Sequence, residues 1–313
     1  MNNLLRIIAI SSLVSSCENP FSPIGEYTPR LIVYSVISNT GGPQFVRVSS
    51  TYGPVGLSQD QQVPDTGLAG ADVRIIAGGT TYVFRDSLLQ SEDAGSWVNA
   101  YVCDSLPVVH GMQCVLEVRD DSLGFVRSTT TIPTAPVVVI PRETGLTLDN
   151  LMNRPLKFSV GLSTMTRRHQ IRLFIEFETP DSVLRRWEVP LDATDSSFSV
   201  ATYPGFELTD RFVYEIVYPP PSGKATYHWI VDKIAKRYTP AVKFRNMVIE
   251  VIQIGDLERY SSVVNGFRDD LSLRADEPDI SNISGGFGYF GGFTRDEIIR
   301  PFPANFTHDP YHD

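Results

Sequence analysis

Short runs in which apolar and polar residues alternate recur along most of this chain. Residues 71–76 and 81–85 alternate in this way on either side of Gly78 and Gly79, which predicts a β-hairpin with a two-residue turn. Further strand-like runs lie at 31–37, 45–48, 97–103, 113–119 and 125–132. Seven or so short strands within about one hundred residues are typical of an immunoglobulin-like β-sandwich, which we expect over residues 30–133.

The second half of the chain has the same β character with a less regular pattern. Strand-like runs lie at 156–162, 170–178, 185–189, 212–218 and 243–254. One segment, 256–267, instead carries apolar residues at helical spacing, and Asp256 is suited to cap it. The expected fold class is therefore mainly all-β. It comprises two β-sandwich domains, the first immunoglobulin-like and the second, over 142–300, with one short helix near 256–267.

The ends of these two units are marked by changes in composition. Several prolines bracket a stiff linker at 134–141. Residues 280–293 combine glycine and serine with aromatic side chains, and we expect this stretch to cross and dock on the second sandwich. The tail at 301–313 is expected to fray. A polar loop at 51–69 is long enough to carry a binding surface.

The first sixteen residues carry the features of an export signal. Arg6 supplies a positive charge, residues 7–14 form an apolar run of about eight residues, and two serines lead into Cys17. This run is much shorter than the roughly twenty residues that cross a bilayer. The pattern resembles a bacterial lipoprotein signal, so we expect a signal peptide at 1–16, lipidation of Cys17 and a tether at 17–29. The alternative is an ordinary secretory signal with an incidental cysteine.

Charge narrows the range of partners. The chain has 313 residues and a net charge of −9 at pH 7. An acidic balance of this size argues against nucleic acid as a partner and against electrostatic attraction to an anionic membrane surface. Attachment to a membrane would therefore rest on the lipid at Cys17, whose methylenes each contribute about 0.8 kcal/mol when buried.

Two further cysteines lie eleven positions apart, at Cys103 and Cys114. In an oxidising compartment an even pair predicts a disulfide, provided that the flanking runs 97–103 and 113–119 pair as a hairpin and bring the sulfur atoms together. The alternative is two buried thiols on separate strands. A metal site is not expected here, because only His110 lies nearby.

Candidate chemistry elsewhere in the sequence is sparse. The spelling Gly286-x-Gly288-x-x-Gly291 fits a dinucleotide fingerprint, but it lacks the strand before it and the helix after it, so a glycine-aromatic β turn is favoured. No cofactor and no metal ligand set are predicted. The histidines are scattered, at His110, His169, His228, His308 and His312. Acidic clusters at 120–121, 192–195 and 269–279 lack calcium-loop spacing and are interpreted as solvated turns.

Exposed aromatic side chains offer a further hypothesis. The candidates for a carbohydrate or peptide platform are Tyr52, Trp97, Tyr203 and Trp229. Tryptophans in a sandwich belong more often to the core, which remains the alternative for these residues. No catalytic residues are assigned.

Five sequence features together suggest a known family. They are the lipoprotein signal that ends at Cys17, the early run at 29–34, the entry into the first hairpin at 70–73, the exit from the first unit at 131–133 and the glycine-aromatic stretch at 286–291. In these the chain resembles Bacteroidota lipoproteins grouped as domain of unknown function forty-two forty-nine, over almost the whole mature chain. Members of that family are typically encoded beside TonB-dependent outer-membrane receptors. The resemblance implies a lipid-anchored accessory protein of the outer membrane, on its periplasmic or its surface side, and carries over no catalytic residues.

The expected function is that of a non-enzymatic accessory or binding partner of an outer-membrane receptor. Sandwich edges, the 51–69 loop and the glycine-aromatic stretch would offer the contact surface. Two alternatives stay open. One is an envelope hydrolase that acts on glycan or peptide, which would need a carboxyl group of raised pKa in a cleft between the domains. The other is a purely structural surface protein.

Overall fold

The fold is mainly β, with one helix among the residues that the computed structural model describes, which are 28–51, 67–90, 97–140, 156–191, 202–218, 226–238, 242–255, 281–302 and 307–308. The first strands are β1 (Leu31–Ser38), β2 (Gln44–Ser50), β3 (Asp72–Ala77), β4 (Thr80–Gln90), β5 (Trp97–Cys103), β6 (Gln113–Asp120), β7 (Gly124–Thr131) and β8 (Val137–Val139). The later elements are β9 (Leu156–Gly161), β10 (Arg168–Glu178), β11 (Leu184–Glu188), β12 (Glu207–Leu208), β13 (Val213–Tyr218), α3 (Thr226–Arg237), β14 (Val242–Ile254), β15 (Phe287–Pro301) and β16 (Thr307–His308). The predicted all-β class is confirmed.

The first unit wraps eight strands around one hydrophobic core. Its strands follow the order β15-β1-β2-β5-β4-β3-β6-β7, and Ser284, just before β15, bridges to Arg127 on β7. Apolar residues of these strands, among them Val33, Val46 and Leu116, are fully or almost fully buried together. Because side chains alternate along a strand, each strand contributes every second residue to this core.

The predicted hairpin at the centre of this unit is confirmed. Strands β3 and β4 pair from Val73 with Phe84 to Ala77 with Thr80. Gly78 and Gly79 form the turn with φ of 58° and 79°. Residues that carry a side chain rarely adopt such positive φ, so the turn favours glycine at both positions.

The predicted hairpin of 97–103 with 113–119 is wrong. Strand β5 pairs with β2 and β4, whereas β6 pairs with β3 and β7. The loop between β5 and β6 therefore crosses from one part of the sheet to another. Alternation fixed the two strands correctly, but it carries no information on which strand lies beside which.

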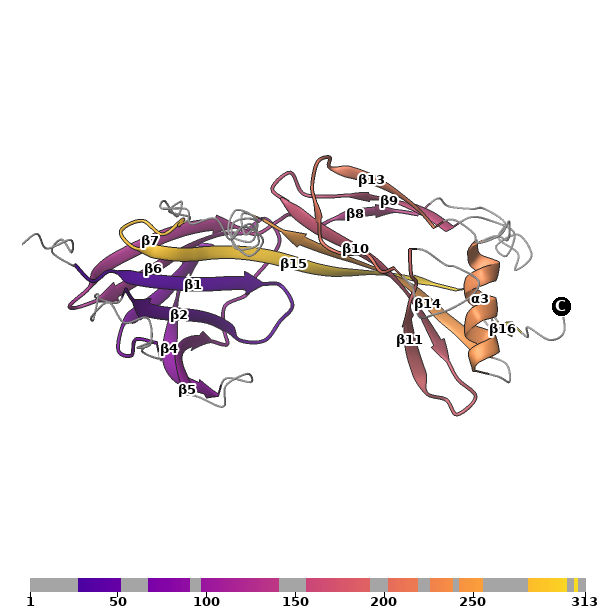
Figure 1. The fold of residues 1–313 in the computed structure, drawn as a ribbon, viewed down its shortest axis with the longest axis horizontal. Helices are drawn as coiled ribbons and strands as arrows, with labels where there is room; N and C mark the ends of the chain where they lie inside the picture. The colour runs from indigo at the N-terminus through magenta and orange to yellow at the C-terminus, as the bar shows by residue number, and fades with distance from the viewer. Residues whose placement is uncertain are drawn as a thin grey trace, which may run out of the picture.

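The second unit packs two sheets and a helix around its own core. Strands β11-β10-β14-β15 form one layer and β13-β9-β8 form the other, as Figure 1 shows. Along β10, Leu173, Ile175 and Phe177 enter the core between the layers, in agreement with the predicted alternation. Strand β8 lies within the stretch expected to be a linker, so residues 137–139 join the second unit as an edge strand.

Helix α3 closes one end of the second core and was not predicted. Trp229, Ile230 and Ile234 of this helix are buried in that core. Its last turn carries Lys236 and Arg237, where the helix dipole favours positive charge. The helix predicted near 256–267 lies outside the described residues.

Strand β15 belongs to both units and runs along most of the molecule in Figure 1. Its first half pairs in parallel with β1, from Ile32 with Phe287 to Ser38 with Phe293. Its second half pairs antiparallel with β14, from Ile254 with Phe293 to Asn246 with Pro301. The prediction that the glycine-aromatic stretch docks on the second sandwich is thus corrected, because that stretch completes the first unit. The expected fraying from residue 301 is also corrected in part, because β16 pairs with β14.

A buried polar cluster joins the two units beside β15. The side chain of Gln253 is fully buried, and its Oε1 accepts hydrogen bonds from the backbone N of Ser163 at 2.7 Å and from Thr166 Oγ1 at 2.9 Å. Its Nε2 donates to the carbonyl oxygen of Thr134 at 2.9 Å. Since Thr134 follows the last strand of the first unit, this one amide links the chain on both sides of the junction. The division into two domains at 134–141 stays a prediction.

Loops of the first unit also contact β15 directly. Asp296 Oδ1 lies 2.9 Å from Nε2 of His110 and 3.2 Å from Nδ2 of Asn39. The side-chain oxygen of Asn39 accepts a hydrogen bond of 2.8 Å from the backbone N of Arg295. These contacts lie in the half of β15 that pairs with the second unit.

Candidate functional site

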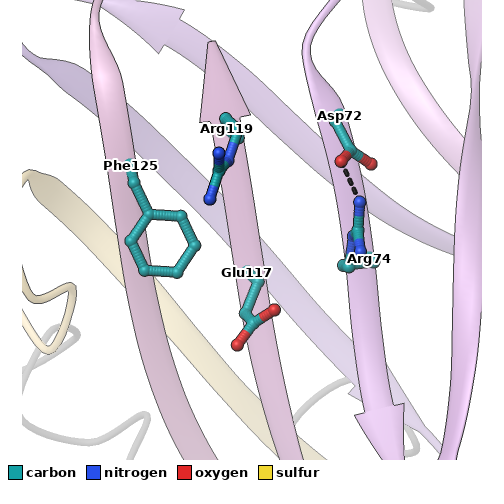
Figure 2. A pocket seen from close by; sticks show the side chains of 5 residues that line it. All are labelled: Asp72, Arg74, Glu117, Arg119 and Phe125. Atoms are coloured by element: carbon teal, nitrogen blue, oxygen red, sulfur yellow. Dashed lines mark hydrogen bonds and ion pairs between the residues drawn. The ribbon is translucent and has the colours of Figure 1, made fainter.

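A pocket of about 320 Å³ lies on the outer face of the first unit, over β3, β6 and β7. It is lined by Asp72, Arg74, Glu117, Arg119 and Phe125, which we call the charged face. Figure 2 shows these five side chains on three neighbouring strands. The pocket is an open depression in a sheet surface.

Strand alternation places these side chains outward. On β3, Val73 and Ile75 enter the core, so Asp72 and Arg74 face solvent. The same alternation on β6 directs Glu117 and Arg119 to the outer face. The register then sets opposite charges against each other across the two strands, because Asp72 pairs with Arg119 and Arg74 with Glu117.

The two carboxylates of the charged face are both matched by arginines. Asp72 forms an ion pair with Arg74, and this hydrogen bond raises the pKa of the Arg74 guanidinium. Glu117 Oε1 lies 3.6 Å from Nε of Arg127. The arrangement is therefore one of compensated charge on a solvated surface, where water screens single ion pairs and they contribute little to stability.

Arg119 differs from the other charged residues of this face. Its guanidinium carbon lies 5.6 Å from the centre of the Phe125 ring, and it forms no ion pair with any described residue. An arginine that stacks on an aromatic ring keeps its N–H groups available for a carboxylate or a phosphate. The charged face can thus bind a ligand that combines an anionic group with an apolar or ring-shaped part.

A second polar cluster lies around His169 at the edge of the second unit's core. His169 is buried at the start of β10, and its Nδ1 lies 3.0 Å from Thr209 Oγ1. Burial lowers the pKa of His169, which keeps the imidazole neutral. The Tyr214 ring lies 4.3 Å away, and its hydroxyl donates to Asp210 Oδ1 at 2.9 Å. These contacts hold the 207–214 segment on β10, which is a packing role.

The two cysteines of the described chain are free and buried. Cys103 ends β5 and Cys114 lies on β6, and the two strands have different neighbours in the sheet. The expected disulfide is therefore corrected to the alternative of two separate thiols. Burial raises the pKa of Cys114 to about 11, so its sulfur stays protonated and unreactive near neutral pH. Cys17 lies outside the described residues.

The aromatic candidates do not form one platform. Trp229 is a core residue, whereas Trp97 on β5 and Tyr203 are exposed and lie on different units. Tyr52, together with most of the 51–69 loop, lies outside the described residues.

Among the histidines, His110 is held by Asp296 and His169 lies in its own cluster, whereas His312 falls outside the described residues. His228 is part of α3 and His308 of β16. Within the described ranges, no group of three or more His, Cys, Asp or Glu side chains is placed to hold a metal ion.

The remaining sequence motifs are placed by the backbone. Asp120 is a turn residue, because its Oδ1 accepts hydrogen bonds from Ser122 and from the backbone N of Leu123, and the Ser122 hydroxyl lowers its pKa. The other two acidic clusters lie outside the described residues. Residues 287–291 lie within strand β15 and no helix follows them in the described chain, in agreement with the rejected dinucleotide fingerprint. The favoured glycine-aromatic β turn is corrected to a strand that pairs with β1. In the part of the chain that is described, no helix is long and apolar enough to span a membrane.

Sequence reasoning missed the charged face. A signal for it was present, because Asp72 and Arg74 alternate with apolar residues, as do Glu117 and Arg119. That spacing predicts two charged outer faces, but only the β3–β6 pairing brings them together.

Comparison with known proteins adds one finding. A family model described as "Domain of unknown function (DUF4249)" matches residues 18–299. No curated protein matches the chain.

Proposed function

This chain belongs to the family defined by domain of unknown function DUF4249, and from that premise we propose that it is a lipid-anchored, non-enzymatic binding component of the bacterial cell envelope. Its partner in this proposal is a TonB-dependent outer-membrane receptor. The sequence of the first seventeen residues supports the anchor, because an apolar run and two serines precede Cys17.

The charged face is the observation that carries the binding role. It is an open pocket on a sheet in which β3 and β6 are paired on both sides and β7 is paired with β6, so the backbone that carries its side chains is in place before any partner arrives. Preorganised surfaces bind with less loss of conformational entropy. Arg119, stacked on Phe125, is the side chain that we expect to contact an anionic group of the partner.

The arrangement favours binding over hydrolysis. A glycan or peptide hydrolase would place an acid and a base around a substrate. In the charged face, Asp72 and Glu117 each face an arginine instead. The pocket lies on an outer sheet surface, where water reaches a ligand freely.

Co-purification from native outer membranes tests the proposal. The full chain carries a tag after Asp313 and is extracted in mild detergent, with Cys17→Ala as the variant that cannot be lipidated. Stoichiometric recovery of a TonB-dependent receptor with the wild type, and its loss with Cys17→Ala, is the expected result. Recovery of the lipidated protein without a receptor would refute a stable complex, and glycan and peptide screens for hydrolysis would follow.

Two further variants test whether the charged face makes the contact. Arg119→Ala removes the stacked guanidinium, and we expect it to reduce receptor recovery at least about tenfold, as loss of an interface arginine often does. Arg85→Ala is the matched control, because Arg85 is an exposed strand residue of the same unit that forms an ion pair with the exposed Asp104. Equal recovery with both variants would place the contact elsewhere.

A further inference from the structure

His110 lies between two hydrogen-bond acceptors at the junction of the two units. Its Nδ1 lies 3.2 Å from the carbonyl oxygen of Pro133, and its Nε2 lies 2.9 Å from Oδ1 of Asp296. Carbonyl and ionised carboxylate oxygens accept hydrogen bonds and donate none. A neutral imidazole carries one N–H and can donate to one of these oxygens, whereas an imidazolium donates to both. The two contacts together therefore match the imidazolium.

The carboxylate of Asp296 is itself incompletely solvated. Its Oδ1 is 2.9 Å from His110 Nε2 and accepts from Asn39 Nδ2 at 3.2 Å. Its Oδ2 is buried and has no hydrogen-bond partner in the described part of the chain. A carboxylate oxygen that is buried without a donor is costly unless a nearby positive charge offsets it. An imidazolium at His110 supplies that charge.

The other charged residues close to this pair along the chain have partners of their own. Arg295 and Glu297, which flank Asp296 on β15, lie on the opposite face of the strand and form ion pairs with residues of β14 and β11. In the loop that carries His110, the charged residue is Asp104, which pairs with Arg85. Residues 39–43 and 132–136, whose segments also contact the pair, carry no charge. Asp296 is thus the charged group that faces the imidazole.

This pair fastens loops of the first unit to β15. Asn39 lies between β1 and β2, His110 lies between β5 and β6, and Asp296 lies in the half of β15 that pairs with β14. Asn39 also accepts a hydrogen bond of 2.8 Å from the backbone N of Arg295. Strand β15 remains paired with β1 as far as Phe293 without these contacts. Their loss would therefore free the loops without separating the units.

We propose that His110 and Asp296 form a pH-sensitive latch, which is closed when His110 is protonated. Histidine is the side chain that ordinarily changes charge between about pH 5 and pH 8. Protonation adds the second donated hydrogen bond, so the stability of the closed latch is complete at the acidic end of this range and is lost as the pH rises. The latch belongs to the junction of the units, so the proposal does not depend on the proposed receptor.

Hydrogen exchange of the full chain measures the opening of the latch. The backbone amide of Arg295 donates to Asn39 and exchanges when that loop leaves β15. Its protection factor, corrected for the intrinsic pH dependence of exchange, is expected to fall at least about threefold from about pH 5.5 to about pH 8. The amides of the β3–β4 hairpin are the internal control, because neither strand contains a histidine, and they should keep their protection.

Three variants separate the charge change from packing. His110→Gln can still donate to Asp296 but keeps one charge state, so the Arg295 amide should have the same protection at both pH values. Asp296→Asn keeps the size and an acceptor oxygen but removes the charge, and it should also abolish the pH dependence. Asp104→Asn is the matched control, because it removes an acidic residue of the same loop that faces Arg85 instead, and it should retain the wild-type dependence. Thermal unfolding shows whether each variant is folded.

Three outcomes would overturn the proposal. The first is a wild-type chain whose Arg295 amide is equally protected at both pH values. The second is a His110→Gln variant that keeps the wild-type pH dependence, which would assign that dependence to another group. The third is a folded Asp296→Asn variant that lowers protection by the same factor at both pH values, which would leave the pair with a packing role alone.

Discussion

At the scale of single residues, Gly288 shows how the glycine-aromatic stretch fits its neighbours. Its backbone φ of 107° is one that residues with a side chain rarely adopt. A Cβ at this position would also overlap the backbone of Val33 on β1. The glycine therefore allows β15 to lie close against β1. The sequence showed that glycines are frequent in this stretch, but not that β1 was the neighbour.

Replacement of this glycine tests the close approach. Gly288→Ala is expected to lower the free energy of unfolding by about 4 kcal/mol, because both backbone strain and steric overlap oppose the methyl group. Gly79→Ala is the control, because Gly79 also has positive φ but nothing lies within 4 Å of an added Cβ. Gly79→Ala should lower the free energy of unfolding by about 1 to 2 kcal/mol, from backbone strain alone. Urea unfolding measures both, and equal losses would contradict the argument.

The buried thiol of Cys114 gives a pH dependence whose sign follows from its pKa. Burial raises that pKa from 9.0 to about 11, so the native state holds the proton more tightly than the unfolded state. The stability due to this group is complete below pH 9.0 and is lost as the pH rises to about 11. Cys114→Ala should therefore show a smaller decline of the urea midpoint across this range. Val118→Ala, which shortens a fully buried side chain of the same strand but removes no ionisable group, should keep the decline of the wild type.

At the scale of elements, a row of charges crosses strands β11, β10, β14 and β15. Glu250 on β14 is fully buried, and its carboxylate oxygens lie 3.1 Å from Nη1 of Arg172 and 2.6 Å from Nε of Arg295. Glu188 on β11 pairs with the other side of Arg172. Four strands are thus joined by side chains as well as by their backbones.

The buried member of this row should matter most. Glu250→Gln is expected to lower the free energy of unfolding by about 3 kcal/mol, because it leaves two arginines beside a neutral group. Glu297→Gln, on β15, breaks a pair with Arg186 at 2.9 Å that is partly solvated, and should cost less than about 1 kcal/mol. Chemical unfolding compares the two, and a larger loss for Glu297→Gln would contradict the assignment.

Most strand positions were predictable to within a few residues, although β8 and β15 were not predicted as strands, whereas the pairing of strands was not predictable. The run at 97–103 was predicted with its observed bounds, and the faces of β10 followed from alternation. Helix α3 was missed because its β-branched and aromatic residues, such as Trp229 and Ile230, do not distinguish a short buried helix from a strand. The charged face was missed because it depends on the pairing of β3 with β6.

At the scale of the whole molecule, β15 couples the stabilities of the two units. Unfolding of either unit removes the partner of one half of this strand, either β1 or β14. The buried amide of Gln253 adds hydrogen bonds across the same junction. We therefore expect one cooperative transition for both units.

A core variant in one unit and a probe in the other test this coupling. Leu173→Ala, in the second core, is expected to lower the free energy of unfolding by about 3 kcal/mol. The same loss of unfolding free energy should appear as faster alkylation of Cys114, which lies in the first core, because that thiol reacts when its unit opens. Tryptophan fluorescence reports the second unit through Trp187 and Trp229. Unchanged alkylation of Cys114 in this variant would show that the units unfold separately.

The amino-acid sequence by itself determined the class of the fold, most strand positions and which side chains of a strand share a face. These properties depend on a period of two residues, which backbone geometry imposes locally. Tertiary structure alone decided that β5 and β6 do not pair, that β15 serves both units, and that His110 lies beside Asp296. Each of these depends on contacts between residues far apart in the chain, and a local period of two residues carries no information about such contacts.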